Sequence, residues 1–172
     1  MKKLSVICMT ILAVTFLASC RGPQGPAGHD GNANVASSTV TIRSVDWQWV
    51  NNCQWMVEID YPAINNNVYN HGAVLVYMDV DGAWSQVPLT YFYEAQLEDG
   101  TYANFASSIE VATLSDGGVR LFWTESDFYK NPDGPGRHDF KIVAIEATVF
   151  ANRTDVDYSD YEAVKTAFQL AD

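Results

Sequence analysis

The fold class of this chain is decided by a stretch near its end, Phe140-Lys141-Ile142-Val143-Ala144-Ile145-Glu146-Ala147-Thr148-Val149-Phe150. Side chains alternate between the two faces of a β-strand, and here both faces are largely apolar. A strand that is covered on both sides has this composition, whereas a strand with one solvated face alternates between apolar and polar residues. The stretch therefore predicts a central strand, which we place over Asp139–Asn152.

The chain before this stretch has the pattern of further short strands. Runs rich in valine, isoleucine, threonine, tyrosine and tryptophan are separated by turns that contain glycine and asparagine. A change of apolar face in the first run predicts a bulge or bend near Arg43-Ser44. Asp81-Gly82 predicts a hairpin turn, and Asn65-Asn66-Asn67 predicts a loop. The predicted strands lie near Ser38–Val50, Gln54–Tyr61, Gly72–Met78, Trp84–Thr90, Ser107–Leu114 and Val119–Glu125.

A helix is predicted after the last strand. Ser159 and Glu162 have the spacing of a capping box, and Tyr161, Val164 and Phe168 then recur at helical spacing. This amphipathic helix would pack on a sheet or its edge. The sequence therefore predicts a mainly β fold, an antiparallel β-sandwich of about seven strands with a short C-terminal helix.

The first residues have the order of a bacterial secretory signal. Lys2 and Lys3 precede an apolar run, Leu4–Leu17, which ends in Leu17-Ala18-Ser19-Cys20. The run is shorter than the ~20 residues that span a bilayer as a helix. We expect residues 1–19 to be a lipoprotein signal peptide with the cleavage box Leu17, Ala18 and Ser19, and Cys20 to carry the lipid. A cleaved signal without lipid is the alternative.

A short collagen-like segment follows the cysteine. Glycine occupies every third position from Gly22 to Gly31, which is the period of a triple helix. Four triplets are too few for a stable triple helix, so the sequence predicts a spacer over residues 20–34. A weak trimer through this spacer is the alternative. Residues 35–172 form the predicted β domain.

The charge balance bears on the partners of the chain. The formal net charge is −11, and loss of the two lysines with the signal would change it to about −13. Such a balance repels nucleic acid and anionic headgroups, so the membrane contact is expected to run through the lipid anchor. Because Cys8 leaves with the signal and Cys20 carries the lipid, Cys53 has no cysteine partner. It is either buried and inert, which we expect, or a reactive thiol.

The acidic residues include one dense group before the predicted helix, consisting of Asp155, Asp157, Asp160 and Glu162. A Ca²⁺ site is conceivable there, but acidic side chains also stabilise the N-terminal end of a helix. We favour the interpretation that these residues stabilise the N-terminal end of the helix. His71 and His138 do not form a spaced ligand pair, so zinc is not expected. No metal or other cofactor is predicted.

No catalytic motif stands out. The sequence contains no Gly-x-Ser-x-Gly elbow, phosphate-binding loop or dinucleotide fingerprint. We therefore expect a protein that is not an enzyme, with a hydrolase built on paired carboxylates as the alternative. Three aromatic residues in a row, Tyr91-Phe92-Tyr93, cannot all face inward on one strand. Tyr91, Tyr93 and Trp84 are accordingly the candidate platform for a glycan or peptide ligand.

Several segments together resemble a family of Bacteroidota lipoproteins with a lipobox, a Gly-Pro spacer and one β-rich domain. The segments that carry the resemblance are Leu17-Ala18-Ser19-Cys20, Gly22-Pro23-Gln24-Gly25-Pro26-Ala27-Gly28, Gly72-Ala73-Val74-Leu75-Val76-Tyr77, Trp84-Ser85-Gln86-Val87-Pro88-Leu89-Thr90, Phe140-Lys141-Ile142-Val143-Ala144-Ile145 and Ser159-Asp160-Tyr161-Glu162-Ala163-Val164-Lys165. The resemblance implies an envelope location and carries over no catalytic residue.

The residue after the lipid cysteine bears on orientation. A run of acidic residues after the lipid cysteine resembles a surface-export signal in this phylum, but here Arg21 follows Cys20. The expected location is the outer membrane, facing the periplasm, with surface display as the alternative.

Overall fold

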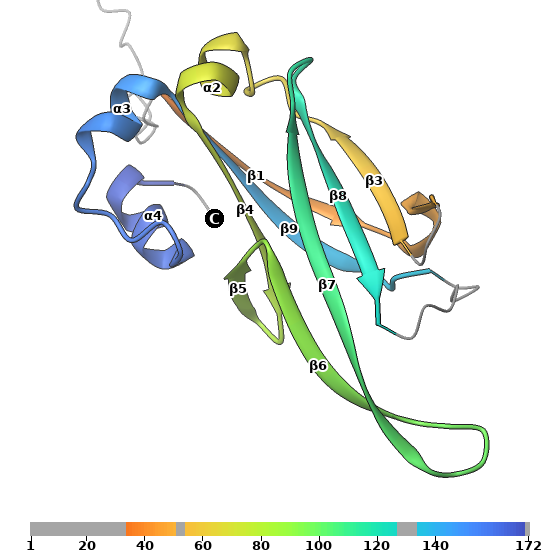
Figure 1. Cartoon of the computed structure of the whole chain (residues 1–172). Coiled ribbons are helices and arrows are strands. Elements are labelled where there is room, and N and C mark those ends of the chain that lie inside the picture. Colours follow the sequence, from red (N-terminus) through yellow and green to blue (C-terminus); the bar gives the residue numbers. More distant parts are fainter. Residues whose placement is uncertain (1–33, 51–53, 127–133, 171–172) are drawn as a thin grey trace, which may run out of the picture. The chain divides into compact units, whose positions relative to one another are not determined.

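The computed structural model describes residues 34–50, 54–126 and 134–170. Their strands form two antiparallel sheets that pack face to face (Figure 1). The four-stranded sheet has the order β1 (Val35–Ile42), β9 (His138–Ile145), β4 (Ala73–Val80), β5 (Ala83–Gln86). The five-stranded sheet has the order β2 (Gln48–Trp49), β3 (Gln54–Asp60), β8 (Gly118–Glu125), β7 (Tyr102–Leu114), β6 (Leu89–Gln96). The predicted sandwich is confirmed.

The helices are short. In the part of the chain that the structure describes, the α-helices are α2 (Asn66–His71), α3 (Ala147–Asn152) and α4 (Tyr161–Phe168), and a 3-10 turn, η2, spans Ser44–Asp46. In Figure 1, α3 and α4 lie on the side of the four-stranded sheet that faces away from the five-stranded sheet. Within the described part of the chain, no helix is long and apolar enough to cross a membrane.

The central strand is β9, as predicted. It lies between β1 and β4 and is buried on both faces. Phe140 and Ile142 pack in the core between the two sheets, whereas Val143 and Ile145 pack against the opposite face. All four side chains are fully buried, and each contributes about 1.5–3 kcal/mol of hydrophobic stabilisation.

A second, smaller core covers the outer face of β9. Its buried members are Leu75, Tyr77, Val143, Ile145, Tyr161, Val164 and Phe168. The helix α4 supplies Tyr161, Val164 and Phe168, the three residues whose spacing predicted an amphipathic helix. The helix is thus held on the four-stranded sheet by the apolar face that the sequence shows.

Two of the predicted strands are each divided in the structure. The run predicted over Ser38–Val50 becomes β1 and β2, and a 3-10 turn separates them at the position of the expected bulge or bend. Arg43 closes this turn by an ion pair with Asp46 at 2.9 Å. The run predicted over Trp84–Thr90 ends in the four-stranded sheet at Gln86 and resumes in the five-stranded sheet at Leu89. Pro88 stands at the crossing, where its missing N–H would interrupt a ladder.

The predicted loop at Asn65-Asn66-Asn67 is wrong, because α2 begins there. The side chain of Asn65 accepts hydrogen bonds from the backbone N–H groups of Asn67 at 2.9 Å and Val68 at 3.0 Å. Asparagine favours both turns and helix N-caps, so its presence alone did not distinguish the two.

The last strand is shorter than predicted, since β9 ends at Ile145 and α3 follows. The carbonyl of Glu146 accepts from the backbone N–H groups of Val149 and Phe150, which starts the helical turn. The alternation of Ala147 and Val149 fits a strand, but both positions are accommodated on a helix that packs at the second core. Tertiary packing overrides the local pattern here.

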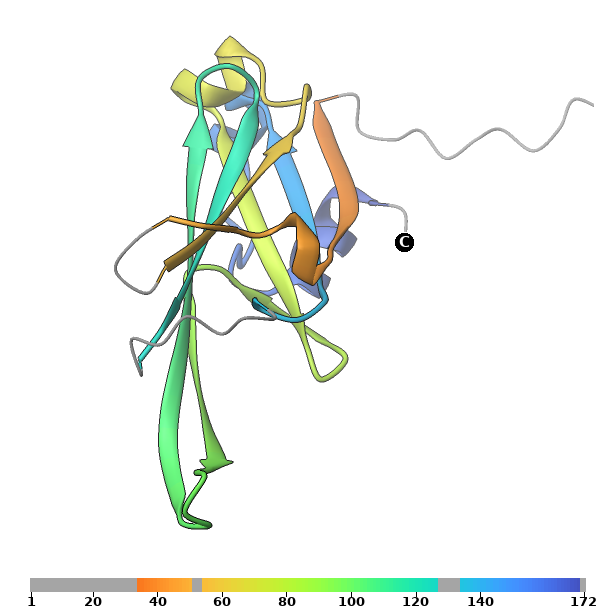
Figure 2. The ribbon, with the colours of Figure 1, turned by 90° about the vertical axis from the view of Figure 1, so that its right-hand side faces the viewer.

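The strands β6 and β7 form a hairpin that extends beyond the other strands of its sheet (Figures 1 and 2). The pairing begins at Leu89 opposite Ile109 and continues to Gln96 opposite Tyr102. Tyr91-Phe92-Tyr93 thus lies within a regular strand. Phe92 is 80% exposed on the outer face, which resolves how three consecutive aromatics share one strand.

Candidate functional site

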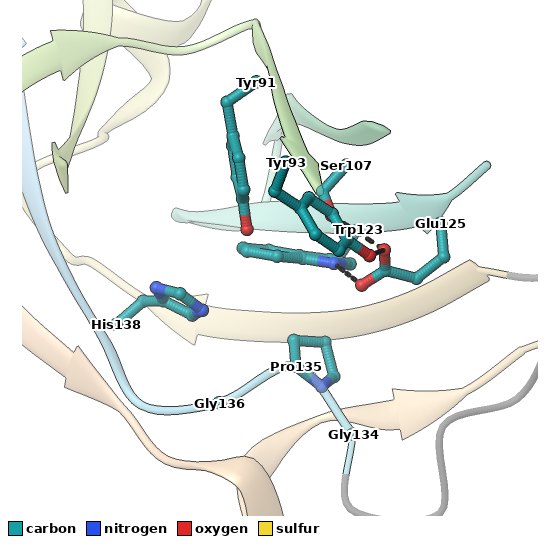
Figure 3. Close-up of a pocket in the computed structure, with 9 residues that line it drawn as sticks. All are labelled: Tyr91, Tyr93, Ser107, Trp123, Glu125, Gly134, Pro135, Gly136 and His138. Atoms are coloured by element: carbon teal, nitrogen blue, oxygen red, sulfur yellow. Dashed lines mark hydrogen bonds between the residues drawn. The ribbon is translucent and has the colours of Figure 1, made fainter. Parts of the chain in front are cut away.

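A pocket of about 290 Å³ lies where the inner face of the five-stranded sheet meets the segment that enters β9 (Figure 3). The residues that line it are Tyr91, Tyr93, Ser107, Trp123, Glu125, Gly134, Pro135, Gly136 and His138. We refer to these nine residues as the aromatic pocket. In Figure 3 the tyrosine rings lie on one side of Trp123, and His138 and Pro135 lie on the other.

Strand register explains why side chains from β6, β7 and β8 meet in this pocket. Tyr91 pairs with Ser107, and Ser107 pairs with Glu125, so the three residues form one row across the sheet. Tyr93 and Trp123 lie two residues away along their strands and therefore share the same face. The row continues the apolar inner face of the sheet toward the protruding hairpin.

The opposite wall comes from the short segment before β9. Gly134 has a φ of +68°, which favours glycine, and Pro135 after it is buried. A Cβ at Gly134 would lie 3.3 Å from the carbonyl oxygen of Ser44 and 3.6 Å from the ring of Trp55. The glycine thus lets this backbone pass close to the core between the two sheets and form the wall of the pocket.

Glu125 is held in place by three hydrogen bonds from neutral donors. Its Oε2 accepts from the hydroxyls of Ser107 at 2.7 Å and Tyr93 at 3.1 Å. Its Oε1 accepts from the indole Nε1–H of Trp123 at 2.5 Å. Both carboxylate oxygens act as acceptors, which is the hydrogen-bonding pattern of an ionised side chain. Ser107 is itself 1% exposed, so the carboxylate is anchored to the interior of the sheet.

His138 covers the other side of Trp123. The two rings are stacked, with centroids 4.5 Å apart and planes 28° apart. Burial lowers the pKa of His138, although Asp139 and Glu125 act in the opposite direction. The neutral imidazole is therefore favoured at neutral pH, and it stacks as an aromatic ring on the indole.

Tyr91 and Tyr93 give the pocket its remaining aromatic surface. Tyr91 meets Trp123 edge to face, with centroids 5.8 Å apart, and Tyr93 is tilted at 6.1 Å from Tyr91. Burial raises the pKa of Tyr91, so its phenol stays neutral. Tyr93 is 37% exposed at the mouth of the pocket. The pocket thus combines aromatic rings, one fixed carboxylate and a neutral imidazole.

The structure brings two of the three predicted platform residues together. Tyr91 and Tyr93 line the aromatic pocket, but Trp84 belongs to the second core. The Trp84 ring lies 5.9 Å from that of Tyr161, and the Nζ atom of Lys141 lies 4.6 Å above it. These contacts use the Trp84 ring for packing around a buried lysine, which sequence spacing did not indicate.

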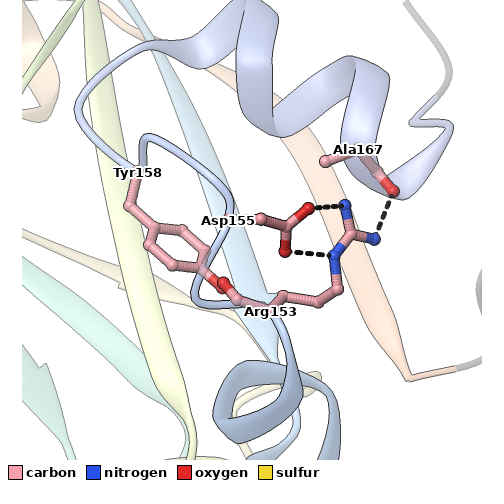
Figure 4. A network of polar contacts seen from close by, with 4 residues as sticks. All are labelled: Arg153, Asp155, Tyr158 and Ala167. Atoms are coloured by element: carbon pink, nitrogen blue, oxygen red, sulfur yellow. Dashed lines mark hydrogen bonds and ion pairs between the residues drawn. The ribbon is translucent and has the colours of Figure 1, made fainter.

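The first of the acidic residues considered for Ca²⁺, Asp155, forms an ion pair with Arg153 at 3.0 Å (Figure 4). Arg153 also donates to the carbonyl of Ala167 at 3.0 Å, and its own carbonyl accepts from the hydroxyl of Tyr158 at 2.9 Å. The hydrogen bond from Arg153 lowers the pKa of Asp155. This network joins the segment after α3 to the C-terminal end of α4.

Two of the other acidic residues, Asp157 and Asp160, accept hydrogen bonds from different groups. Asp157 accepts from the backbone N–H and the hydroxyl of Ser159, and Asp160 caps α4 by accepting from the N–H of Glu162 at 2.9 Å. The predicted capping box on Ser159 is therefore wrong by one residue. Among the described residues, no three His, Cys, Asp or Glu side chains converge as metal ligands.

Sequence patterns did not group four of the pocket residues as a site, namely Ser107, Trp123, Glu125 and His138. One feature of the sequence could have indicated Glu125. The inward positions of β8 are Val119, Leu121 and Trp123, and the next inward position is Glu125. A charged residue that continues an apolar series indicates a polar site at the end of a core. The expected sites at Leu17, Ala18, Ser19, Cys20 and Cys53 lie outside the described residues.

Comparisons of this chain with protein-family models, with curated proteins and with solved structures found no match.

Proposed function

We propose that this chain is a non-enzymatic ligand-binding protein of the bacterial cell envelope, anchored by lipid at Cys20, which binds a small ligand in the aromatic pocket. The observation that carries the binding role is the pocket itself. It is concave, its walls are mostly aromatic, and it contains a small number of polar groups in fixed positions. Ligand sites in proteins have this composition.

The size of the pocket limits what it would hold. About 290 Å³ is at the lower end of the range for ligand pockets, which is about 300–1,000 Å³. One sugar ring or the head of one side chain suits this volume, whereas an extended polymer would have only one unit inside. A carbohydrate or a peptide remains the proposed ligand, since tyrosine rings stack on either kind of unit.

The anchor is supported by the sequence. Lys2, Lys3 and the apolar run Leu4–Leu17 precede Leu17-Ala18-Ser19-Cys20, the order of a lipoprotein signal. Two or more acyl chains give stable membrane attachment, whereas one chain is marginal. The same residues support membership of the Bacteroidota lipoproteins described above. Arg21 favours the periplasmic side of the outer membrane as the location.

Calorimetric titration of the full chain with glucose, N-acetylglucosamine, choline and Nα-acetyl-lysinamide tests the binding role. At least one of these probes should bind the wild-type chain. Tyr93→Ala should weaken that binding about tenfold, since it removes a pocket wall. Tyr102→Ala is the matched control, because Tyr102 is 64% exposed on the same hairpin and does not line the pocket. Absence of binding by all four probes, or equal losses in both variants, would contradict the proposal.

A further inference from the structure

Among the described residues, the groups that contact Glu125 do not balance its charge. Its three hydrogen-bond donors, from Ser107, Tyr93 and Trp123, are all neutral. Among the described residues, no lysine or arginine forms an ion pair with Glu125. A carboxylate that is partly removed from water without a counter-ion raises the free energy of the empty pocket. A bound cation would offset that cost.

The aromatic rings of the pocket favour the same sign of charge. The face of a tyrosine or tryptophan ring carries the negative part of its quadrupole, and a cation within about 6 Å of the ring centre is attracted to it. Tyr91 and Tyr93 lie side by side on one wall, 6.1 Å apart, and both line the cavity beside Glu125. A cationic group in the cavity that they line would face both rings and the carboxylate.

Among the described residues, the rest of the site supplies no positive charge. His138 is stacked on Trp123, and burial lowers its pKa, so it stays neutral near pH 7. Asp139, next to it, accepts from Thr41 at 2.5 Å and pairs with Arg137 at 3.5 Å. The chain as a whole has a formal net charge of −11, which attracts cations toward its surface.

We propose that the aromatic pocket selects ligands that carry an alkylammonium group, with Glu125 as the counter-ion and the faces of Tyr91 and Tyr93 as the walls around the charge. This inference rests on the proposed binding function and names its ligand class. The alkylammonium group could belong to a small quaternary amine or to a lysine side chain of a polypeptide, because both present the same charge on an apolar stem.

The test uses two probes of equal shape and different charge. Choline and dimethylbutanol, its neutral carbon isostere, are titrated into the full chain by calorimetry at neutral pH. The expected result is that choline binds at least about tenfold more tightly than dimethylbutanol. Equal affinity of the two probes would overturn the proposal, because shape alone would then explain binding.

The role of the carboxylate is tested by Glu125→Gln, which keeps the size of the side chain and removes its charge. The affinity for choline should fall about tenfold or more, while that for dimethylbutanol should not change. Glu94→Gln is the matched control. It makes the same change of net charge on β6, at an exposed residue that does not line the pocket. An equal effect of the two substitutions on choline binding would overturn the proposal.

A measurement on the wild-type chain covers the case in which Glu125→Gln does not fold. Raising NaCl from about 50 mM to about 500 mM should weaken choline binding several-fold and leave dimethylbutanol binding unchanged. Salt-independent choline binding would contradict a role for charge. A tighter Kd for choline than for Nα-acetyl-lysinamide would indicate a free quaternary amine as the source, and the reverse order would indicate a polypeptide lysine. Both orders support the alkylammonium class.

Failure of this inference is distinguishable from failure of the proposed function. If N-acetylglucosamine binds, is weakened by Tyr93→Ala and competes with no amine, the pocket is a binding site for neutral sugars. That result would contradict the alkylammonium proposal and support the binding function. If neither the amines nor the sugars bind the wild-type chain, both proposals are contradicted.

Discussion

Two tyrosines that meet between α4 and the four-stranded sheet, Tyr77 and Tyr161, differ in one hydrogen bond. Tyr77 and Tyr161 are both buried, and their rings lie edge to face with centroids 5.3 Å apart. The hydroxyl of Tyr77 donates to the carbonyl of Tyr158 at 2.7 Å. Within the described part of the chain, the hydroxyl of Tyr161 has no hydrogen-bond partner. Comparing the two residues therefore shows how a buried hydroxyl changes the free energy of unfolding when it has a hydrogen-bond partner and when it has none.

We predict opposite outcomes for the two phenylalanine substitutions. Tyr77→Phe should lower the free energy of unfolding by about 1–2 kcal/mol, because it leaves the Tyr158 carbonyl without its donor. Tyr161→Phe should leave it unchanged within about 0.5 kcal/mol or raise it, because a buried hydroxyl without a partner is removed. Chemical denaturation of both variants measures the difference. A larger loss in Tyr161→Phe than in Tyr77→Phe would refute this account of the second core.

His138 makes the free energy of unfolding of the protein depend on pH. Burial lowers its pKa below the ordinary value, so the unfolded chain takes up a proton at a higher pH than the folded chain. Stability is therefore lost as pH falls through the ordinary histidine range. Between about pH 7.5 and pH 5.5, wild type should lose more free energy of unfolding than His138→Gln. An equal or greater loss in the variant, in matched denaturation experiments, would contradict this direction.

At the residue scale, the sequence predicted part of the site and missed its polar part. Tyr91 and Tyr93 could be singled out because consecutive aromatics cannot all face inward on one strand. The stacking of His138 on Trp123 could not be predicted in this way, because it joins β9 of one sheet to β8 of the other. Trp84, like Tyr91, is an aromatic residue of a strand, and the sequence alone does not separate the two. The register of β5 places Trp84 at the second core.

At the scale of elements, the N-cap of α4 provides a direct comparison of two neighbouring residues. Asp160 accepts from the backbone N–H of Glu162, whereas Ser159 donates its hydroxyl to Asp157 outside the helix. Asp160→Ala should lower the free energy of unfolding by about 1 kcal/mol, and Ser159→Ala by less than about 0.5 kcal/mol. Thermal or chemical denaturation checks both. A larger effect of Ser159→Ala would restore the capping box that the sequence suggested.

The elements that the sequence predicted well are those whose pattern spans many residues. The two-faced apolar strand β9 and the amphipathic helix α4 each place several side chains in a core. It missed the part of β6 beyond Thr90 and two short helices, α2 and α3, each of six residues. One or two local hydrogen bonds decide elements of this length, so propensity carries little information about them. Asn65 and Glu146 supply those bonds here.

At the scale of the whole molecule, the central proposal is a β-sandwich that carries a binding pocket and is held at a membrane by lipid. The anchor predicts that radiolabelled palmitate enters the wild-type protein and that the protein sediments with membranes. Cys20→Ala should abolish both the label and the membrane association, because removal of the thiol removes the site of acylation. Cys53→Ala is the matched control and should change neither. Membrane association of Cys20→Ala equal to that of wild type would contradict the anchor.

The location of bound ligand is the most direct test of the account. The indole N–H of Trp123 donates to Glu125 in the aromatic pocket, whereas Trp84 packs with Tyr161 in the second core. In a ¹H–¹⁵N spectrum of the full chain, the two indole signals are assigned by single tryptophan-to-phenylalanine variants. Titration with choline should give a saturable shift of the Trp123 signal and leave the Trp84 signal in place. A Trp123 signal that does not move with choline or with N-acetylglucosamine, or a shift confined to Trp84, would contradict a binding site in this pocket.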